Sequence, residues 1–289
     1  MLRLENRELP EELQTVLDRL QQSVNDASGF AAQVEEAQAL WKSKGNSAGK
    51  NAFNKIAGVL AEMCVYVKVC NYCEQNEATD IEHVYPKSFF PSLAFEWKNY
   101  ILACKQCNSA YKSDKCFVID PRGIVHEVKR GQEPEHHSLA FINPRIDDPF
   151  KYLWLNTQTW KFEIWDTLSK KDYNIADKTL FVLKLNERDL LIEDRKNSAT
   201  YYYERMKTLL EIMEANSIED IENTLAPYDN ELDKTIPLQE IKNRIKENFK
   251  IHLNKFKHPS VWNSIKKIES IATPKWKKIF DKIPEARNW

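Results

Sequence analysis

The sequence lacks long apolar runs. No segment of its 289 residues reaches the roughly 18 consecutive apolar residues that a membrane-spanning helix needs. Its first residues, MLRLENRELPEELQ, carry acids where a signal peptide has an apolar core. Nothing in the sequence therefore predicts a membrane span or export, and we expect a cytoplasmic protein.

The sequence also lacks the large positive charge of a general nucleic-acid binder. Lys and Arg number 42, and Asp and Glu number 43, which leaves a formal net charge of −1. Contacts with phosphate would therefore have to come from local patches. Two stretches have an excess of basic residues, one between His83 and Arg130 and the other from Ile251 to Lys282.

No Gly/Ser-rich tether and no internal repeat divides the chain. Apolar residues recur at helical spacing near both ends, and short alternating segments lie between them. We predict an α+β fold that is predominantly helical. Its expected parts are an N-terminal helical scaffold (1–68), a central core (69–150), and a hairpin followed by C-terminal helices (151–289). A single packed unit is the alternative.

The periodicity predicts individual elements as well. Helices are expected over residues 10–26, 30–41, 48–68, 174–185, 187–213 and 238–253, and from 261 to the end. Strands are expected within residues 78–85 and 99–103, with hairpins over 116–128 and 152–165. A short helix should follow the second of the two strands, from residue 108 to 112.

Two Cys-x-x-Cys pairs enclose the most informative stretch, residues 70–112, which reads CNYCEQNEATDIEHVYPKSFFPSLAFEWKNYILACKQCNSAYK. Such pairs match the ligand spacing of tetrahedral zinc sites, and a chain without an export signal favours metal ligation over disulfides. We therefore predict a structural Zn²⁺ held by Cys70, Cys73, Cys104 and Cys107. Buried free thiols are the alternative.

The insertion between the cysteine pairs contains an acid directly before a histidine. Glu82 offers the oxygen ligand that a hard cation prefers, and His83 has an ordinary pKa of about 6.5, which suits a general base at neutral pH. Asp80 shares a strand face with Glu82 and is a second candidate ligand. The alternative interpretation is a surface acid beside a histidine with ordinary hydrogen bonds.

These residues resemble the HNH endonucleases, whose fold is the ββα-metal fold. The resemblance lies in DIEHVYPKS (residues 80–88), Asn99 and CKQCN (residues 104–108). It implies that Glu82 binds a catalytic Mg²⁺ or Mn²⁺, that His83 activates water, and that Asn99 holds the loop that orients the histidine. The third motif position, often histidine, falls on Asn108, which would supply an amide oxygen to the same metal.

Other polar residues are assigned less directly. Lys87, Lys105 and Lys112 are predicted to contact phosphates of DNA, with ordinary solvated lysines as the alternative. The remaining histidines show no ligand spacing and none is predicted to bind metal: His126, His136, His137, His252 and His258. Cys64 and Cys116 have no matched partner and are expected to be small buried apolar residues.

A narrower resemblance extends over about residues 65–205. Asp120-Pro121, residues 141–149 and residues 185–188 are similar to bacterial HNH proteins encoded beside an ATPase in phage-defence systems, such as the Septu nuclease subunit and retron-associated proteins. This resemblance implies an ATPase partner and DNA as substrate. The alternative function is a zinc-containing module that binds nucleic acid or a partner without catalysis, which would need only the cysteines.

Overall fold

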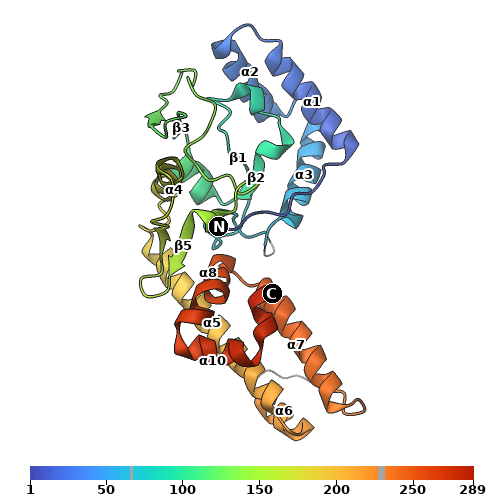
Figure 1. Cartoon of the computed structure of the whole chain (residues 1–289). Helices are drawn as coiled ribbons and strands as arrows, with labels where there is room; N and C mark the ends of the chain where they lie inside the picture. Colours follow the sequence, from blue (N-terminus) through green and yellow to red (C-terminus); the bar gives the residue numbers. More distant parts are fainter. Residues whose placement is uncertain (66–67, 227–231) are drawn as a thin grey trace. The chain divides into compact units, whose positions relative to one another are not determined.

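The computed structural model describes residues 1–65, 68–226 and 232–289. The chain forms two compact units (Figure 1). One comprises Met1–Trp154 and Lys161–Leu191, and the other Leu155–Trp160 and Ile192–Trp289. The boundaries expected after residues 68 and 150 stay predictions.

Three helices open the first unit: α1 (Glu11–Asn25), α2 (Phe30–Ser43) and α3 (Ser47–Glu62). α1 turns Leu13, Leu17, Leu20 and Val24 into the core, as its helical spacing predicts. The corner between α2 and α3 is tight, because a Cβ added at Gly49 would lie 1.8 Å from the Lys44 carbonyl oxygen.

α3 ends earlier than predicted. Its last turn tightens, with the Cys64 amide donating to the Ala61 carbonyl. The prediction that the helix continues beyond Glu62 is therefore wrong for residues 63–65. Residues 66 and 67 lie outside the described part of the chain.

The centre of the first unit is a strand pair followed by a short helix. β1 (Asp80–His83) pairs antiparallel with β2 (Tyr100–Ala103), and Glu82 lies opposite Ile101. The loop between them contains short 3₁₀ turns, η1 (Pro91–Leu93) and η2 (Trp97–Asn99). After β2 comes a π-helical segment, η3 (Gln106–Lys112). This is the predicted order of strand, loop, strand and helix.

Helices flank this centre (Figure 1). α3 packs against β2, while α4 (Lys170–Leu183) packs against η3 and β3 (Phe117–Ile119). β3 pairs with β4 (Val125–Glu127), and β5 (Leu153–Asn156) pairs with β6 (Lys161–Ile164). A further 3₁₀ turn, η4 (Pro149–Lys151), precedes β5. The mostly helical α+β class is thus confirmed, with small two-stranded sheets between helices.

The second unit is helical. It contains most of α5 (Asp189–Glu214), and then α6 (Ile218–Leu225), α7 (Leu238–Asn254) and α8 (Pro259–Ser264). The chain ends with η6 (Ile265–Glu269), α9 (Ser270–Ala272), α10 (Pro274–Lys282) and η7 (Pro284–Asn288). In the described parts of the chain, no helix is both long and apolar enough to cross a membrane.

The structure of this unit differs from the sequence analysis in two places. The single helix predicted from residue 261 is interrupted, because Pro274 and Pro284 each begin a new segment and cannot donate the backbone hydrogen bond that a continuous helix requires. α6 was not predicted, although its start carries a capping box in which Ser217 and Asp220 satisfy each other's backbone amides.

Candidate active site

The four predicted cysteines meet in one buried cluster. Cys70 and Cys73 precede β1, Cys104 and Cys107 follow β2, and their Sγ atoms all lie within 4.8 Å of one another. The Sγ atoms of Cys73 and Cys104 are 3.9 Å apart. Zn–S bonds of about 2.3 Å in a tetrahedron place sulfur atoms about 3.8 Å apart. The cluster therefore fits a zinc ion that would join the segment before β1 to the segment after β2.

Donors around the sulfur atoms complete this cluster. The Cys107 amide lies 3.4 Å from Cys104 Sγ, and Asn76 Nδ2 lies 3.8 Å from the same atom. The buried guanidinium of Arg188 places Nη1 3.4 Å from Cys107 Sγ. A zinc ion bound by four thiolates carries excess negative charge, and the positive guanidinium would offset it. Cysteine spacing gave no signal for this role of Arg188.

Glu82 forms a buried ion pair. Its Oε1 lies 2.6 Å from Lys112 Nζ, and the two side chains are 6% and 4% exposed. Burial raises the pKa of the Glu82 carboxyl, and the positive charge of Lys112 opposes that shift. Lys112 Nζ also donates to the His83 carbonyl at 2.7 Å. Lys112 is therefore not the solvated lysine that the alternative interpretation allowed.

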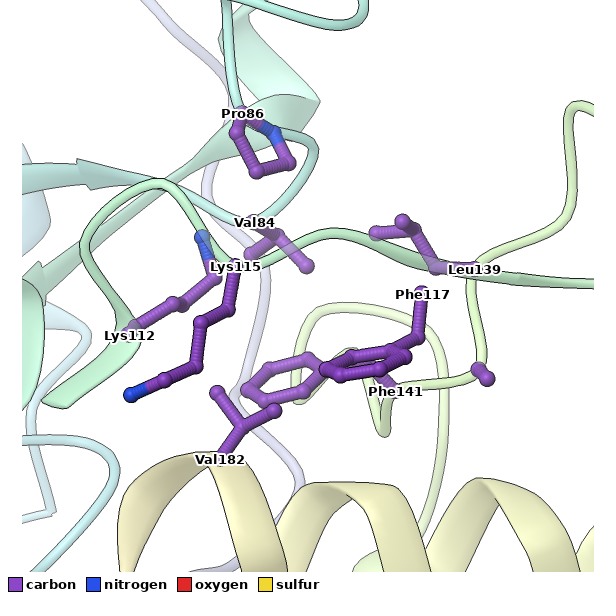
Figure 2. Close-up of a pocket in the computed structure, with 9 residues that line it drawn as sticks. Val84, Pro86, Lys112, Lys115, Phe117, Leu139, Phe141 and Val182 are labelled. Atoms are coloured by element: carbon purple, nitrogen blue, oxygen red, sulfur yellow. The ribbon is translucent and has the colours of Figure 1, made fainter. Parts of the chain in front are cut away.

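An apolar pocket holds the stem of Lys112 in place. Figure 2 shows the Lys112 and Lys115 side chains beside Val84, Phe141 and Val182, the last contributed by α4. The cavity is only about 10 Å³, so it has room for one water at most. The methylene groups of Lys112 thus pack on apolar side chains while its ammonium reaches the polar site.

His83 is the last residue of β1 and is 5% exposed. Its Nε2 lies 2.9 Å from the Ala94 carbonyl oxygen. A carbonyl can only accept a hydrogen bond, so Nε2 carries the proton and Nδ1 keeps its lone pair. Burial, followed by the charge of Lys87, lowers the pKa of His83 well below its usual value. The ring is therefore neutral at neutral pH, as a general base must be.

Asn99 holds both ends of the loop that contains Ala94. Its Nδ2 donates to the Leu93 carbonyl at 2.8 Å and to the Tyr85 carbonyl at 2.9 Å. Its Oδ1 accepts from the Tyr85 amide at 2.7 Å. The side chain is 3% exposed, so its polar atoms need partners within the protein, and these three hydrogen bonds provide them. The same bonds fix the loop. The hydrogen-bond acceptor of His83 is thereby fixed too.

A polar cavity of about 90 Å³ opens in front of Glu82 and His83. Lys87, Asn108 and Lys112 also line it, so the structure brings these predicted residues together. By the same measure one water needs about 10–15 Å³, so an ion with several waters fits. Lys105 is exposed and lies outside this lining among the described residues.

Asp80 contacts the site through Asn108. Asn108 Nδ2 lies 3.1 Å from Asp80 Oδ2. With the nitrogen directed at that carboxylate, the amide oxygen of Asn108 is free to act as a ligand. Asp80 is half-buried and is not one of the residues that line the cavity in the described chain.

One residue of this site was missed by the sequence analysis. Trp41 of α2 lines the cavity, with its ring centroid 4.2 Å from that of His83. The ammonium of Lys44 lies 3.0 Å from the centroid of the same indole. Burial, followed by the charge of Lys87, lowers the pKa of Lys44 to about 7. A helix predicted only as scaffold thus supplies one wall of the site.

Comparison with known proteins identifies the domain. The family model described as HNH endonuclease matches residues 70–114. The chain contains an HNH endonuclease domain. The matched range includes the four-cysteine cluster as well as Glu82, His83, Asn99 and Asn108. The resemblance inferred from the motif is confirmed.

The HNH domain lies inside a longer region of similarity. Septu protein PtuB of Bacillus thuringiensis is 29% identical over 174 residues, which cover 59% of this chain and 55% of that protein. The chain therefore matches about half the length of this distant relative. No solved structure matches the chain.

Proposed function

We propose that the chain is a metal-dependent HNH endonuclease that hydrolyses phosphodiester bonds of DNA. One observation carries this proposal: a buried carboxylate, Glu82, and a neutral histidine, His83, face the same polar cavity within the matched HNH domain. The alternative, a zinc-containing module that binds nucleic acid or a partner without catalysis, would need only the cysteines. Burying an acid and an imidazole side by side costs free energy and so favours a catalytic role.

Glu82 and Asn108 are the residues that would hold Mg²⁺ or Mn²⁺. The fit is chemical: both offer oxygen, the ligand of hard cations, and the buried Glu82 carboxylate already binds a cation, the ammonium of Lys112. When bound, the ion would stabilise negative charge on the attacked phosphate and on the leaving oxygen. Asp80 would not need to contact the ion: its carboxylate accepts a hydrogen bond from Asn108 Nδ2 and would orient the Asn108 amide toward the metal.

His83 would act as the general base. Its Nδ1 takes a proton from water as the water oxygen bonds to phosphorus and the bond to the leaving oxygen breaks. The hydrogen bond from Nε2 to Ala94 keeps the ring in the required tautomer. Asn99 is then a positioning residue, because it holds the loop on which Ala94 lies.

Basic residues would position the DNA backbone. Lys87 lines the cavity and is the best placed of the three predicted lysines to contact a flanking phosphate. Lys112 forms an ion pair with Glu82, so it would act at the metal site and not on a flanking phosphate. Lys105 is exposed within the matched HNH residues and keeps its predicted role in phosphate binding. Such contacts are independent of base sequence and weaken as salt increases.

The four cysteines would hold a structural zinc ion. They join the segment before β1 to the start of η3, so the ion would fix the two elements that carry Glu82 and Asn108. A closed set of four thiolates leaves no position for water or substrate. The zinc would therefore maintain the site and take no part in the chemistry.

The cellular role we propose is anti-phage defence together with an ATPase partner. The distant similarity to Septu protein PtuB supports this role, because that relative is a Septu protein and matches 59% of the chain. A partner that positions or admits DNA would also suit a chain whose net charge is only −1. Co-expression with an ATPase whose gene adjoins that of this chain, followed by co-purification, tests the association.

Plasmid cleavage tests the proposed activity. Supercoiled plasmid is incubated with the chain and its co-expressed ATPase partner in Mg²⁺, in Mn²⁺ or in EDTA. We expect nicking that requires the metal and is lost in Glu82→Gln, which keeps the shape of the side chain and removes its charge. The exposed acid Glu77 provides a matched control, Glu77→Gln. Nicking that survives EDTA and Glu82→Gln would refute the proposal, as would inactivity of the complete complex in both metals.

A further inference from the structure

A second group of potential metal ligands lies outside the matched HNH residues. The carboxylate of Asp120 and the imidazoles of His126 and His136 each offer one ligand atom, and these atoms lie within 4.8 Å of one another. Sixteen positions separate the first and last of them (136 − 120), so no short ligand motif reveals the group. The fold of the β3–β4 hairpin assembles it.

The turn after β3 holds the Asp120 carboxylate rigidly. Its Oδ1 accepts from the Arg122 amide at 2.9 Å and from the Ile124 amide at 2.8 Å. Gly123 makes the turn possible with a φ of +81°. These two hydrogen bonds fix the orientation of the Asp120 carboxylate. Its Oδ2 remains directed at His126, 3.7 Å from Nε2.

Backbone pairing brings the two histidines to this carboxylate. His126 lies in the middle of β4, opposite Val118 of β3. On the other edge of β3, the Ile119 amide donates to the Ser138 carbonyl, which fixes the segment that follows His136. The two imidazole centroids are 5.2 Å apart. Three neighbouring backbone segments therefore contribute one ligand each.

We propose that Asp120, His126 and His136 bind a divalent transition-metal ion of the Zn²⁺ class, at a site separate from the four-cysteine cluster. Two imidazoles and one carboxylate form the donor set that such ions prefer, whereas Mg²⁺ prefers oxygen alone. Tetrahedral bonds of about 2.0–2.1 Å would place ligand atoms about 3.3 Å apart. Asp120 Oδ2 and His126 Nε2 are already close to that separation, at 3.7 Å.

The accessibility of the two histidines would make an ion at this site exchangeable. His126 has a side chain that is 43% exposed, and His136 is half-buried, so both rings can turn toward a bound ion. Three protein ligands leave a fourth position open to water. The ion would clip the loop that contains His136 to the hairpin, and it would exchange with free metal far more readily than an ion buried among four cysteines.

Arg122 is the competitor for this site. Its Nε and Nη2 lie 3.1 and 3.0 Å from Asp120 Oδ2, the oxygen that would bind the metal. The Arg122 side chain is 78% exposed and can swing into solvent when an ion arrives. Removing this guanidinium should therefore strengthen metal binding, because the carboxylate would no longer be shared with a cation.

Zinc stoichiometry tests the proposal without reference to nuclease activity. The untagged full chain is equilibrated with micromolar free Zn²⁺, and its zinc content is measured by mass spectrometry. We expect the wild type to bind one more zinc per chain than His136→Ala or His126→Ala. His137→Ala is the matched control, since this exposed histidine lies next to His136 in the same loop, and it should bind as much zinc as the wild type.

Arg122→Gln provides the second measurement. We expect a several-fold lower Kd for the additional zinc ion in this variant. Co²⁺ placed there should absorb weakly and without the thiolate charge-transfer band of a cysteine site. Equal zinc content in the wild type and His136→Ala would overturn the proposal. So would an unchanged Kd in Arg122→Gln or an equal loss of zinc in His137→Ala.

Discussion

Lys112 places its ammonium 2.6 Å from the Glu82 carboxylate, and both side chains are buried. The same ammonium donates to the backbone carbonyl of His83, the proposed base. Lys112 thus supplies positive charge at the carboxylate that would bind the divalent ion. An internal cation thus holds this part of the site together, and a metal ion at Glu82 would have to move or share that contact.

Lys112→Met should destabilise the metal-free protein by about 3–5 kcal/mol, because a buried carboxylate would lose its partner. Saturating Mn²⁺ should restore part of that loss, since the ion would take over the charge of the ammonium. Urea unfolding in EDTA and in Mn²⁺ measures both effects.

Lys115→Met is the control for this variant. Lys115 also extends along the apolar pocket, but its ammonium contacts the Tyr111 carbonyl instead of an acid. Its stability should not respond to Mn²⁺ more than that of the wild type. A Lys112→Met protein with no gain from Mn²⁺ would argue against a metal at Glu82.

Trp41→Ala should raise the pKa of His83 toward its usual value. Burial is the largest cause that lowers this pKa, and the indole of Trp41 packs on the imidazole with centroids 4.2 Å apart. NMR titration of the His83 ring in the metal-free protein measures the change. Trp154→Ala, which removes a half-buried indole that packs on Trp165, should leave the His83 pKa unaltered. An unchanged value in Trp41→Ala would show that another group shields the base.

Cys104→Ser should abolish binding of the proposed zinc ion at the four-cysteine cluster and loosen the HNH domain. Cys104 receives hydrogen bonds from Asn76 and the Cys107 amide, so losing its thiolate disturbs the centre of the cluster. Metal analysis and amide exchange of β1 and β2 follow the two effects. Cys64→Ser is the control: burial raises the pKa of Cys64 to about 11, and its thiol lies outside the cluster. Full zinc retention in Cys104→Ser would contradict the ligand assignment.

Asp194 should make the stability of the second unit dependent on pH. The hydrogen bond from His258, 3.0 Å away, and the pairing with Lys257 lower the pKa of Asp194 to about 2, from 3.8. Because the folded-state pKa is the lower one, the stabilisation is complete above about pH 4 and is lost as the pH falls toward 2.

After solvent screening we expect a contribution on the order of 1 kcal/mol. The free energies of unfolding of the wild type and Asp194→Asn, measured with urea, should therefore differ by this amount at pH 6 and converge as the pH falls toward 2. A difference that does not vary with pH would mean that packing, and not charge, is what the variant removes.

The central elements could be predicted from the sequence because their signals are local. The paired cysteines and the motif around His83 identified the HNH domain, which the family match confirms. The strands β1 and β2 followed from short alternating and apolar runs. Local signals were also overlooked: the capping box at Ser217 marks the start of α6, and Pro274 marks a helix boundary.

Other parts of the site could not be predicted, because tertiary packing creates them. Trp41 precedes His83 by 42 positions (83 − 41) and reaches it only when α2 folds against the β1–β2 loop. The burial of Lys112, which pairs it with Glu82, depends on apolar side chains from α4 and β3. No spacing rule connects residues so far apart in the chain.

The most direct test of the account is single-turnover cleavage of supercoiled plasmid by the wild type and His83→Ala in Mg²⁺, each with the proposed ATPase partner present. A positioned general base typically contributes a factor of about 10²–10⁴ to the rate. We predict a loss of that size in His83→Ala, with metal binding at Glu82 retained. Equal cleavage rates for the two proteins would contradict the account.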